Sequence, residues 1–161
     1  EFMLQMIRDY KEKEFKSVSA EDIAVEESAD AQEKIKQAEE ENKDLLNFIK
    51  TSLGDKVTEV KLSPRLKDSA VCLTTKGGIS LEKVLNAMPQ DQQIRAERIL
   101  ELNPEHPVME ALKNAFAQGD SGKETVKTYA DLLYNQAVLI SGLSVEDPVT
   151  FAKEICSLIT R

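Results

Sequence analysis

The chain has 161 residues, of which 41% are hydrophobic, 31% charged and only 5% aromatic, so its core must be built mainly from aliphatic side chains. This length suits one domain, or a small domain with an appended helical arm. The formal charge is -8, from 29 acidic and 21 basic residues. No basic run is present, and neither nucleic acid nor a membrane surface is an expected partner.

The two cysteines, Cys72 and Cys156, lie far apart and form no C-x-x-C pair. This spacing argues against a disulfide scaffold or a thiolate zinc site and suits a reducing cytoplasm, the expected location. The sequence shows no signal-peptide pattern and no apolar run long enough to span a bilayer. It opens at Glu1 without an initiator methionine, and we therefore expect a part of a longer protein.

The first third of the chain predicts two helices. Apolar residues recur at helical spacing from Phe2 to Tyr10, and a short extended piece, Phe15 to Ser19, follows. The stretch from Ser28 to Leu53 is interpreted as one long helix. Its first half is polar and expected to project into solvent, while its second half has an apolar face and ends at Gly54 as a C-cap.

The middle of the chain predicts three strands and one short helix. Two β-branched runs, Lys56 to Leu62 and Ala70 to Thr75, are typical of strands. A helix from Ile79 to Met88 ends at Pro89, and a third strand is expected from Arg98 to Asn103.

The last third predicts three helices, at His106 to Gln118, Lys123 to Ser141 and Pro148 to about Thr160. Asp147 followed by Pro148 is a typical helix start. The expected fold is α+β, with a small three-stranded sheet packed with helices and a C-terminal helical hairpin. Three segments are expected: 1–19 as an N-terminal helix and lead-in, 20–122 as the α+β layer, and 123–161 as the hairpin of the same domain.

The two helices of this hairpin are apolar over so much of their surface that each must be covered on more than one side. Two hairpins around a two-fold axis make a four-helix bundle, a common route to a homodimer. A hairpin that folds back into a monomeric core is the alternative. The residues expected at the dimer interface are Leu132, Leu133, Leu139, Ile140, Phe151, Ile155, Leu158 and Ile159.

The short helix Ile79 to Met88 is apolar around much of its circumference. Ordinary core packing explains such a pattern. An exposed surface for unfolded proteins is the functional interpretation, because methionine and aliphatic side chains repack around different partners.

Residues for catalysis are not found in any recognisable arrangement. His106 is the only histidine, and its position at a helix start favours a capping or surface role over a general base. No nucleophile elbow, Walker loop or dinucleotide fingerprint occurs. Both cysteines are interpreted as core residues. We therefore expect that the chain is not an enzyme and holds neither metal nor cofactor.

Five ordered stretches carry a family resemblance. They are Glu1 to Met3 leading to F-K-S-V-S, V-T-E-V-K-L-S-P-R-L from Val57, L-E-L-N-P-E-H from Leu100, D-L-L-Y-N-Q-A-V-L from Asp131, and Glu146 to Pro148 with Phe151. Together they resemble the C-terminal dimerisation domain of bacterial chaperones of the heat-shock protein 90 family, and they cover most of the chain.

The resemblance implies a homodimer joined by the last two helices and a role in protein folding under stress. It implies contact with non-native client proteins, with Ile79, Val84, Leu85 and Met88 as the client-binding residues, and with the middle and N-terminal domains of the same protein. ATP with Mg²⁺ would belong to the full-length chaperone. A pure oligomerisation or adaptor module without client binding is the alternative.

Overall fold

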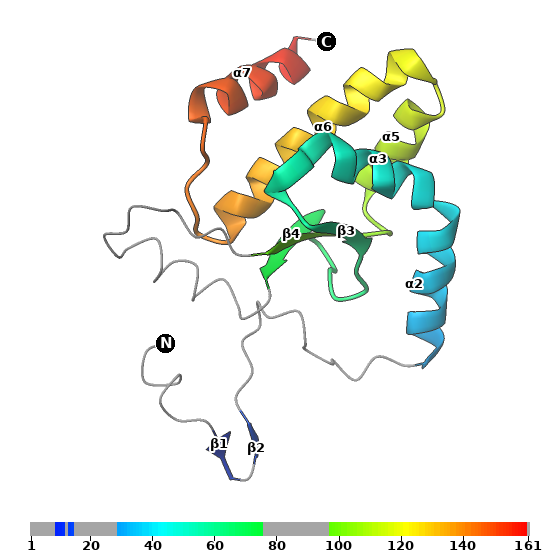
Figure 1. Ribbon diagram of the computed structural model, residues 1–161, viewed down its shortest axis with the longest axis vertical. Coiled ribbons are helices and arrows are strands. Elements are labelled where there is room, and N and C mark those ends of the chain that lie inside the picture. The colour runs from blue at the N-terminus through cyan, green and yellow to red at the C-terminus, as the bar shows by residue number, and fades with distance from the viewer. Residues whose placement is uncertain (1–8, 12, 15–28, 76–96, 161) are drawn as a thin grey trace.

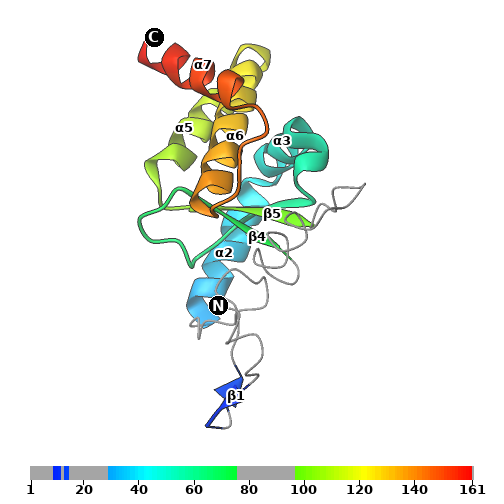
Figure 2. The ribbon, with the colours of Figure 1, turned by 90° about the vertical axis from the view of Figure 1, so that its left-hand side faces the viewer.

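The computed structural model describes residues 9–11, 13–14, 29–75 and 97–160 of the chain. A three-stranded sheet lies at the centre, with helices α3, α5 and α6 gathered on one side of it (Figure 1). A small separate hairpin lies at the end of the molecule opposite the last helix, α7 (Figure 2). Among the described residues, no helix is both long and apolar enough to cross a bilayer.

The sheet consists of β3 (Glu59–Leu62), β4 (Val71–Thr75) and β5 (Arg98–Leu102). The last strand in sequence, β5, lies in the middle, parallel to β3 and antiparallel to β4. Because β5 is covered on both faces, four of its five residues are buried, including the charged Glu101.

The predicted long helix is in fact two helices, α2 (Ala29–Glu41) and α3 (Lys43–Leu53), which run in different directions (Figure 1). The break is at Asn42, whose side-chain amide donates to the Ala38 carbonyl at 2.6 Å. An asparagine side chain that binds the backbone competes with regular helix geometry. The expected C-cap is confirmed, since Gly54 ends α3 with a φ of 57° and begins the 3₁₀ turn η1 (Gly54–Lys56).

The expectation that the first half of this helix projects into solvent is corrected by α2. Ile35 and Ala38 pack against the core. Glu39 accepts a hydrogen bond at 3.0 Å from the backbone N–H of Leu62. That N–H belongs to an edge strand, so the acidic helix covers an edge that would otherwise be open to another strand.

The three C-terminal helices are α5 (Pro107–Phe116), α6 (Asp120–Ile140) and α7 (Pro148–Ile159). Helix α6 starts earlier than predicted, since Gly122 lies inside it rather than in a loop. A side-chain carbon at Gly122 would be 1.7 Å from the Ala115 carbonyl oxygen. This glycine therefore allows α5 and α6 to approach closely, which a single sequence does not distinguish from a loop glycine.

The core lies between the sheet and helices α3, α5 and α6. Its most enclosed members are Leu100, Leu112 and Val126, which are fully buried. Phe48 of α3 and Phe116 of α5 add a ring contact at 5.6 Å between centroids. Because α6 packs on β4 as well as on α3 and α5, it is part of the central core and not a projecting arm.

The N-terminal prediction is wrong where the structure describes it. β1 (Asp9–Tyr10) pairs antiparallel with β2 (Lys13–Glu14). Lys11 in the turn has a φ of 50°, which ends any helix at that point. The remainder of that predicted helix, the piece from Phe15 to Ser19 and the helix from Ile79 to Met88 lie outside the described residues.

Candidate self-association surface

Helix α7 is fixed at its start by local chemistry. Asp147 accepts hydrogen bonds from the Thr150 backbone N–H at 3.0 Å and from its hydroxyl at 2.7 Å, and Pro148 occupies the first turn. The backbone hydrogen bond from Thr150, followed by its hydroxyl, lowers the pKa of the Asp147 carboxyl. This is the cap that the sequence predicts.

None of the residues of α7 is buried within the chain, although many are apolar. Ile159 is 80% exposed and Val149 is 62% exposed. The end of α6 continues the same character. The large exposed hydrophobic side chains of this part of the chain are Leu139, Ile140, Val149, Ile155, Leu158 and Ile159, which we call the α6–α7 apolar surface. Large exposed apolar side chains on neighbouring helices make this part of the chain a candidate interaction site.

The structure separates the eight residues expected at the interface into three groups. Leu139, Ile140, Ile155, Leu158 and Ile159 are exposed, and Leu132 and Phe151 are half-buried. Leu133 lies in the central core instead, at 6% exposure. Sequence reasoning missed Val149, which directly follows the helix-starting proline.

The four residues expected to bind clients, Ile79, Val84, Leu85 and Met88, lie outside the described residues. Their role stays a prediction from the sequence.

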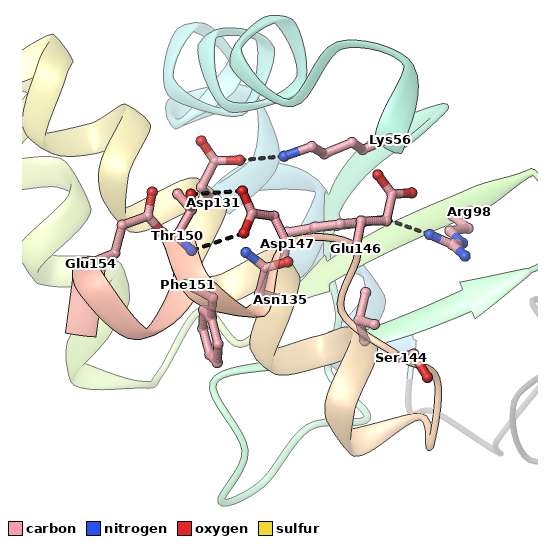
Figure 3. A pocket seen from close by; sticks show the side chains of 12 residues that line it. Lys56, Arg98, Asp131, Asn135, Ser144, Glu146, Asp147, Thr150, Phe151 and Glu154 are labelled. Carbon is pink, nitrogen blue, oxygen red and sulfur yellow. Dashed lines mark hydrogen bonds and ion pairs between the residues drawn. The ribbon is translucent and has the colours of Figure 1, made fainter. Parts of the chain in front are cut away.

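A cavity of about 210 Å³ lies where α7 meets α6 (Figure 3). Lys56 and Asp131 form an ion pair across it at 2.7 Å. The Lys56 ammonium also lies 5.6 Å from the centre of the Tyr134 ring, and Arg98 donates a hydrogen bond to the Tyr134 hydroxyl. Polar contacts thus join η1 and β5 to α6, and the start of α7 completes the lining of the cavity.

Glu154 of α7 stands at the same cavity and lies close to Asp131 and Thr150 (Figure 3). Its Oε2 atom is shielded from solvent and has no hydrogen-bond partner among the described residues. Burial, followed by the negative charge of Asp131, raises the pKa of the Glu154 carboxyl. Lys56 opposes this shift, but it is already paired with Asp131.

A second cavity, of about 310 Å³, lies between α2 and the sheet. Glu101, 1% exposed, accepts a hydrogen bond from Arg65 at 2.6 Å and another from Thr74 at 3.0 Å. Lys61, its register neighbour on β3, is 3.7 Å away. Burial alone would raise the pKa of Glu101, but the hydrogen bonds from Arg65 and Ser63 and the charges of Arg65 and Lys61 hold it below its ordinary value.

The two single residues discussed from the sequence have different fates. The His106 side chain accepts a hydrogen bond at 3.2 Å from the Val108 backbone N–H, which confirms the capping role. Cys72 is half-buried beside Glu101, whereas Cys156 is exposed on α7. The expectation that both cysteines are core residues is therefore wrong for Cys156.

The chain as a whole is similar to one known protein family. The family described as "Hsp90 protein" matches residues 1–161. The chain belongs to the Hsp90 family. A relative named "Chaperone protein HtpG" from Bacillus velezensis is 49% identical over 162 residues, which are 99% of this chain and 25% of that protein.

Further relatives of the same name come from Clostridium perfringens, at 45% identity, and Bacillus subtilis, at 46% identity. Each match covers 99% of this chain and 25% of the relative. The chain therefore spans about a quarter of the length of the Hsp90-family relatives that it matches.

These matches correct two expectations. From the sequence we expected neither enzymatic activity nor a cofactor for this chain. Yet the Hsp90 family matches the chain from its first residue to its last, and the HtpG relatives match nearly all of it. The resemblance itself implies that the family binds and hydrolyses ATP. Membership along the whole chain overturns both exclusions.

The side chains that line the two cavities differ from those that bind ATP. A triphosphate needs converging N–H donors and cations. The cavity beside α7 has four carboxylates and two cationic side chains. In the second cavity, Lys61 and Arg65 already contact Glu101. Neither cavity suits the nucleotide, and the described part of the chain contains no cluster of three metal-binding side chains.

Proposed function

We propose that this chain is a self-association segment of an Hsp90-family chaperone, in which α7 and the end of α6 join two copies. The observation that carries the proposal is that α7 buries none of its residues within its own chain. Its apolar side chains gain the hydrophobic free energy of burial only against something outside the chain.

A second copy of the same surface is the simplest partner. The end of α6 and α7 together present apolar side chains on two neighbouring helices. Two such helix pairs, related by a two-fold axis, form a four-helix bundle. Five of the eight residues that the sequence predicts for this interface belong to the exposed set, which adds Val149. Leu132 and Phe151 are half-buried, and Leu133 lies in the core.

Joining two copies has a mechanical consequence for a chaperone. Contacts between the other parts of the two proteins become intramolecular, and their effective concentration rises without any new contact. The fold suits this role, because α6 carries the surface at one end and is anchored in the core along its length. Client contact through the helix from Ile79 to Met88 and a cytoplasmic location remain proposals that rest on the sequence alone.

Light scattering across a dilution series tests self-association. We expect a mass near twice the 18.0 kDa of the chain. In a variant that combines Leu158→Asp and Ile159→Asp, we expect the monomer mass, because two charges would be buried without partners.

The matched control combines Ala111→Asp with Asn114→Asp, which adds the same charge to the exposed face of α5. This control should still dimerise. A parent that is monomeric at every concentration would refute self-association, and a dimer that tolerates both aspartates on α7 would place the interface elsewhere.

A further inference from the structure

The contact between α6 and α7, which we call the seam, has a cavity lined by more acidic than basic side chains. The charged and titratable groups that line its cavity are Lys56 from η1, Arg98 from β5, Asp131 and Tyr134 from α6, Glu146 and Asp147 from the connection, and Glu154 from α7. Four carboxylates and two cationic side chains therefore line the cavity where α7 meets α6.

Most of these carboxylates have fixed partners. Asp131 is paired with Lys56 at 2.7 Å, and Asp147 is bound by both donors of Thr150. Glu154 differs from them, because its solvent-shielded Oε2 has no hydrogen-bond partner within the described ranges. When the carboxylate is ionised, this one oxygen loses hydration without gaining a donor among the described residues.

Two responses would relieve this cost. The carboxyl can take up a proton and stay in the seam as a neutral group, or it can remain ionised and swing out, which pulls α7 away from α6. Lys56 offsets this cost only in part, because its ammonium is bound to Asp131. Within the described part of the chain, α7 packs on α6 without burying any of its own residues.

We infer that Glu154 is a proton-dependent latch that holds α7 against α6 when its carboxyl is protonated and releases α7 when it ionises. The direction of its pKa agrees with this geometry, because the docked carboxyl has a raised pKa. The docked state therefore binds the proton more tightly than the released state. Docking is favoured at low pH and weakens as the pH rises through the raised pKa of the docked carboxyl.

The consequence for self-association rests on the proposed function. A helix that is held in place presents the α6–α7 apolar surface as one unit, whereas a released helix must lose its freedom again on association. The dimer should accordingly be tighter when Glu154 is protonated.

Amide hydrogen exchange of α7 measures the latch directly. Exchange rates, corrected for the intrinsic effect of pH, should show that protection of residues 148–159 is lost as the pH rises through the raised pKa of Glu154. Glu154→Gln imitates the protonated carboxyl with the same shape. We expect this variant to keep full protection at neutral pH and to lose the pH dependence.

Two further variants distinguish a specific role of Glu154 from a general effect of low pH on the protein. Asp131→Asn frees Lys56 to pair with an ionised Glu154, and protection should then persist at neutral pH. Glu124→Gln changes an exposed carboxylate elsewhere on α6 and should keep the parental pH profile. Protection that does not change with pH in the parent, or a Glu154→Gln variant that keeps the parental profile, would overturn the latch.

The same exchange series on the variant that combines Leu158→Asp and Ile159→Asp measures the contact between α6 and α7 in the absence of a dimer. A parent chain that stays monomeric while its α7 exchange depends on pH would refute self-association and support the latch. A dimer whose α7 exchange ignores pH would refute the latch alone.

Discussion

Helices α5 and α7 begin in the same way and end up in opposite environments. Each starts with a side-chain cap, His106 or Asp147, followed by a proline in the first turn. Helix α5 then buries Met109, Leu112 and Ala115, whereas α7 buries nothing. Two similar amphipathic patterns therefore differ only in whether the chain supplies the surface that covers them. An apolar face predicts that a helix will be covered, but not by which partner.

The largest expected effect is on stability and tests this contrast directly. Leu112→Ala removes a fully buried side chain and should lower the free energy of unfolding by about 2–5 kcal/mol. Ile159→Ala, at 80% exposure, should leave the free energy of unfolding nearly unchanged under conditions where the chain is a monomer. Urea unfolding measures both values, and equal losses would show that α7 is packed within its own chain.

A second prediction contrasts the two partly enclosed glutamates. Glu101 has its pKa lowered against burial by Arg65, Ser63 and Lys61, while Glu154 has its pKa raised by burial and Asp131. A lowered pKa stabilises the fold above the unfolded pKa of Glu101, and this stability is lost as the pH falls through the lower folded value. The raised pKa of the Glu154 carboxyl has the opposite effect: it contributes stability at low pH, and this stability is lost as the pH rises through the raised folded value.

Arg65→Met tests the first half of that contrast. It leaves Glu101 charged and short of one donor, which should cost about 1–3 kcal/mol at neutral pH. The loss of stability between neutral and acid pH should be smaller than in the parent, because Glu101 then has fewer favourable interactions to lose when it is protonated. Glu101→Gln serves as the control that removes the charge itself. Parallel pH profiles for parent and Arg65→Met would contradict the role assigned to the ion pair.

The smallest effect is a difference in reactivity rather than in stability. Burial, followed by the charge of Glu101, raises the pKa of the Cys72 thiol to about 12, and Cys156 is exposed. A neutral alkylating reagent near pH 8 should modify Cys156 rapidly and Cys72 only after unfolding. Mass spectrometry of the labelled peptides follows both sites. Comparable rates would mean that the sheet around Glu101 opens freely.

Much of the local structure was predictable because its causes lie within a few residues. The Asp147–Pro148 cap and the glycine C-cap at Gly54 depend on hydrogen bonds or backbone angles at the element itself. The strands at Glu59–Leu62 and Arg98–Leu102 fall within the predicted runs for the same reason. The family resemblance identified from five short stretches agrees with the family match along the whole chain.

The remaining features depend on contacts between distant residues. A glycine inside a helix at Gly122 and an enclosed Glu101 on a central strand each depend on what another element places beside them. Sequence periodicity carries no record of such neighbours. The assignment of Leu133 to the central core and of Leu139 to the surface, on one helix, was likewise decided only by how α6 lies on the sheet.

The sequence by itself determined the bounds of most described helices and strands to within a few residues, and which of them carry apolar faces. It determined neither the break at Asn42 nor the strand at Asp9–Tyr10. Tertiary structure alone decided that α5 is core, that α7 is left uncovered, and that Glu154 faces Asp131 without a partner. The physical reason is that capping and backbone preferences act over a few bonds. Burial and charge pairing instead depend on residues that only the folded chain brings together.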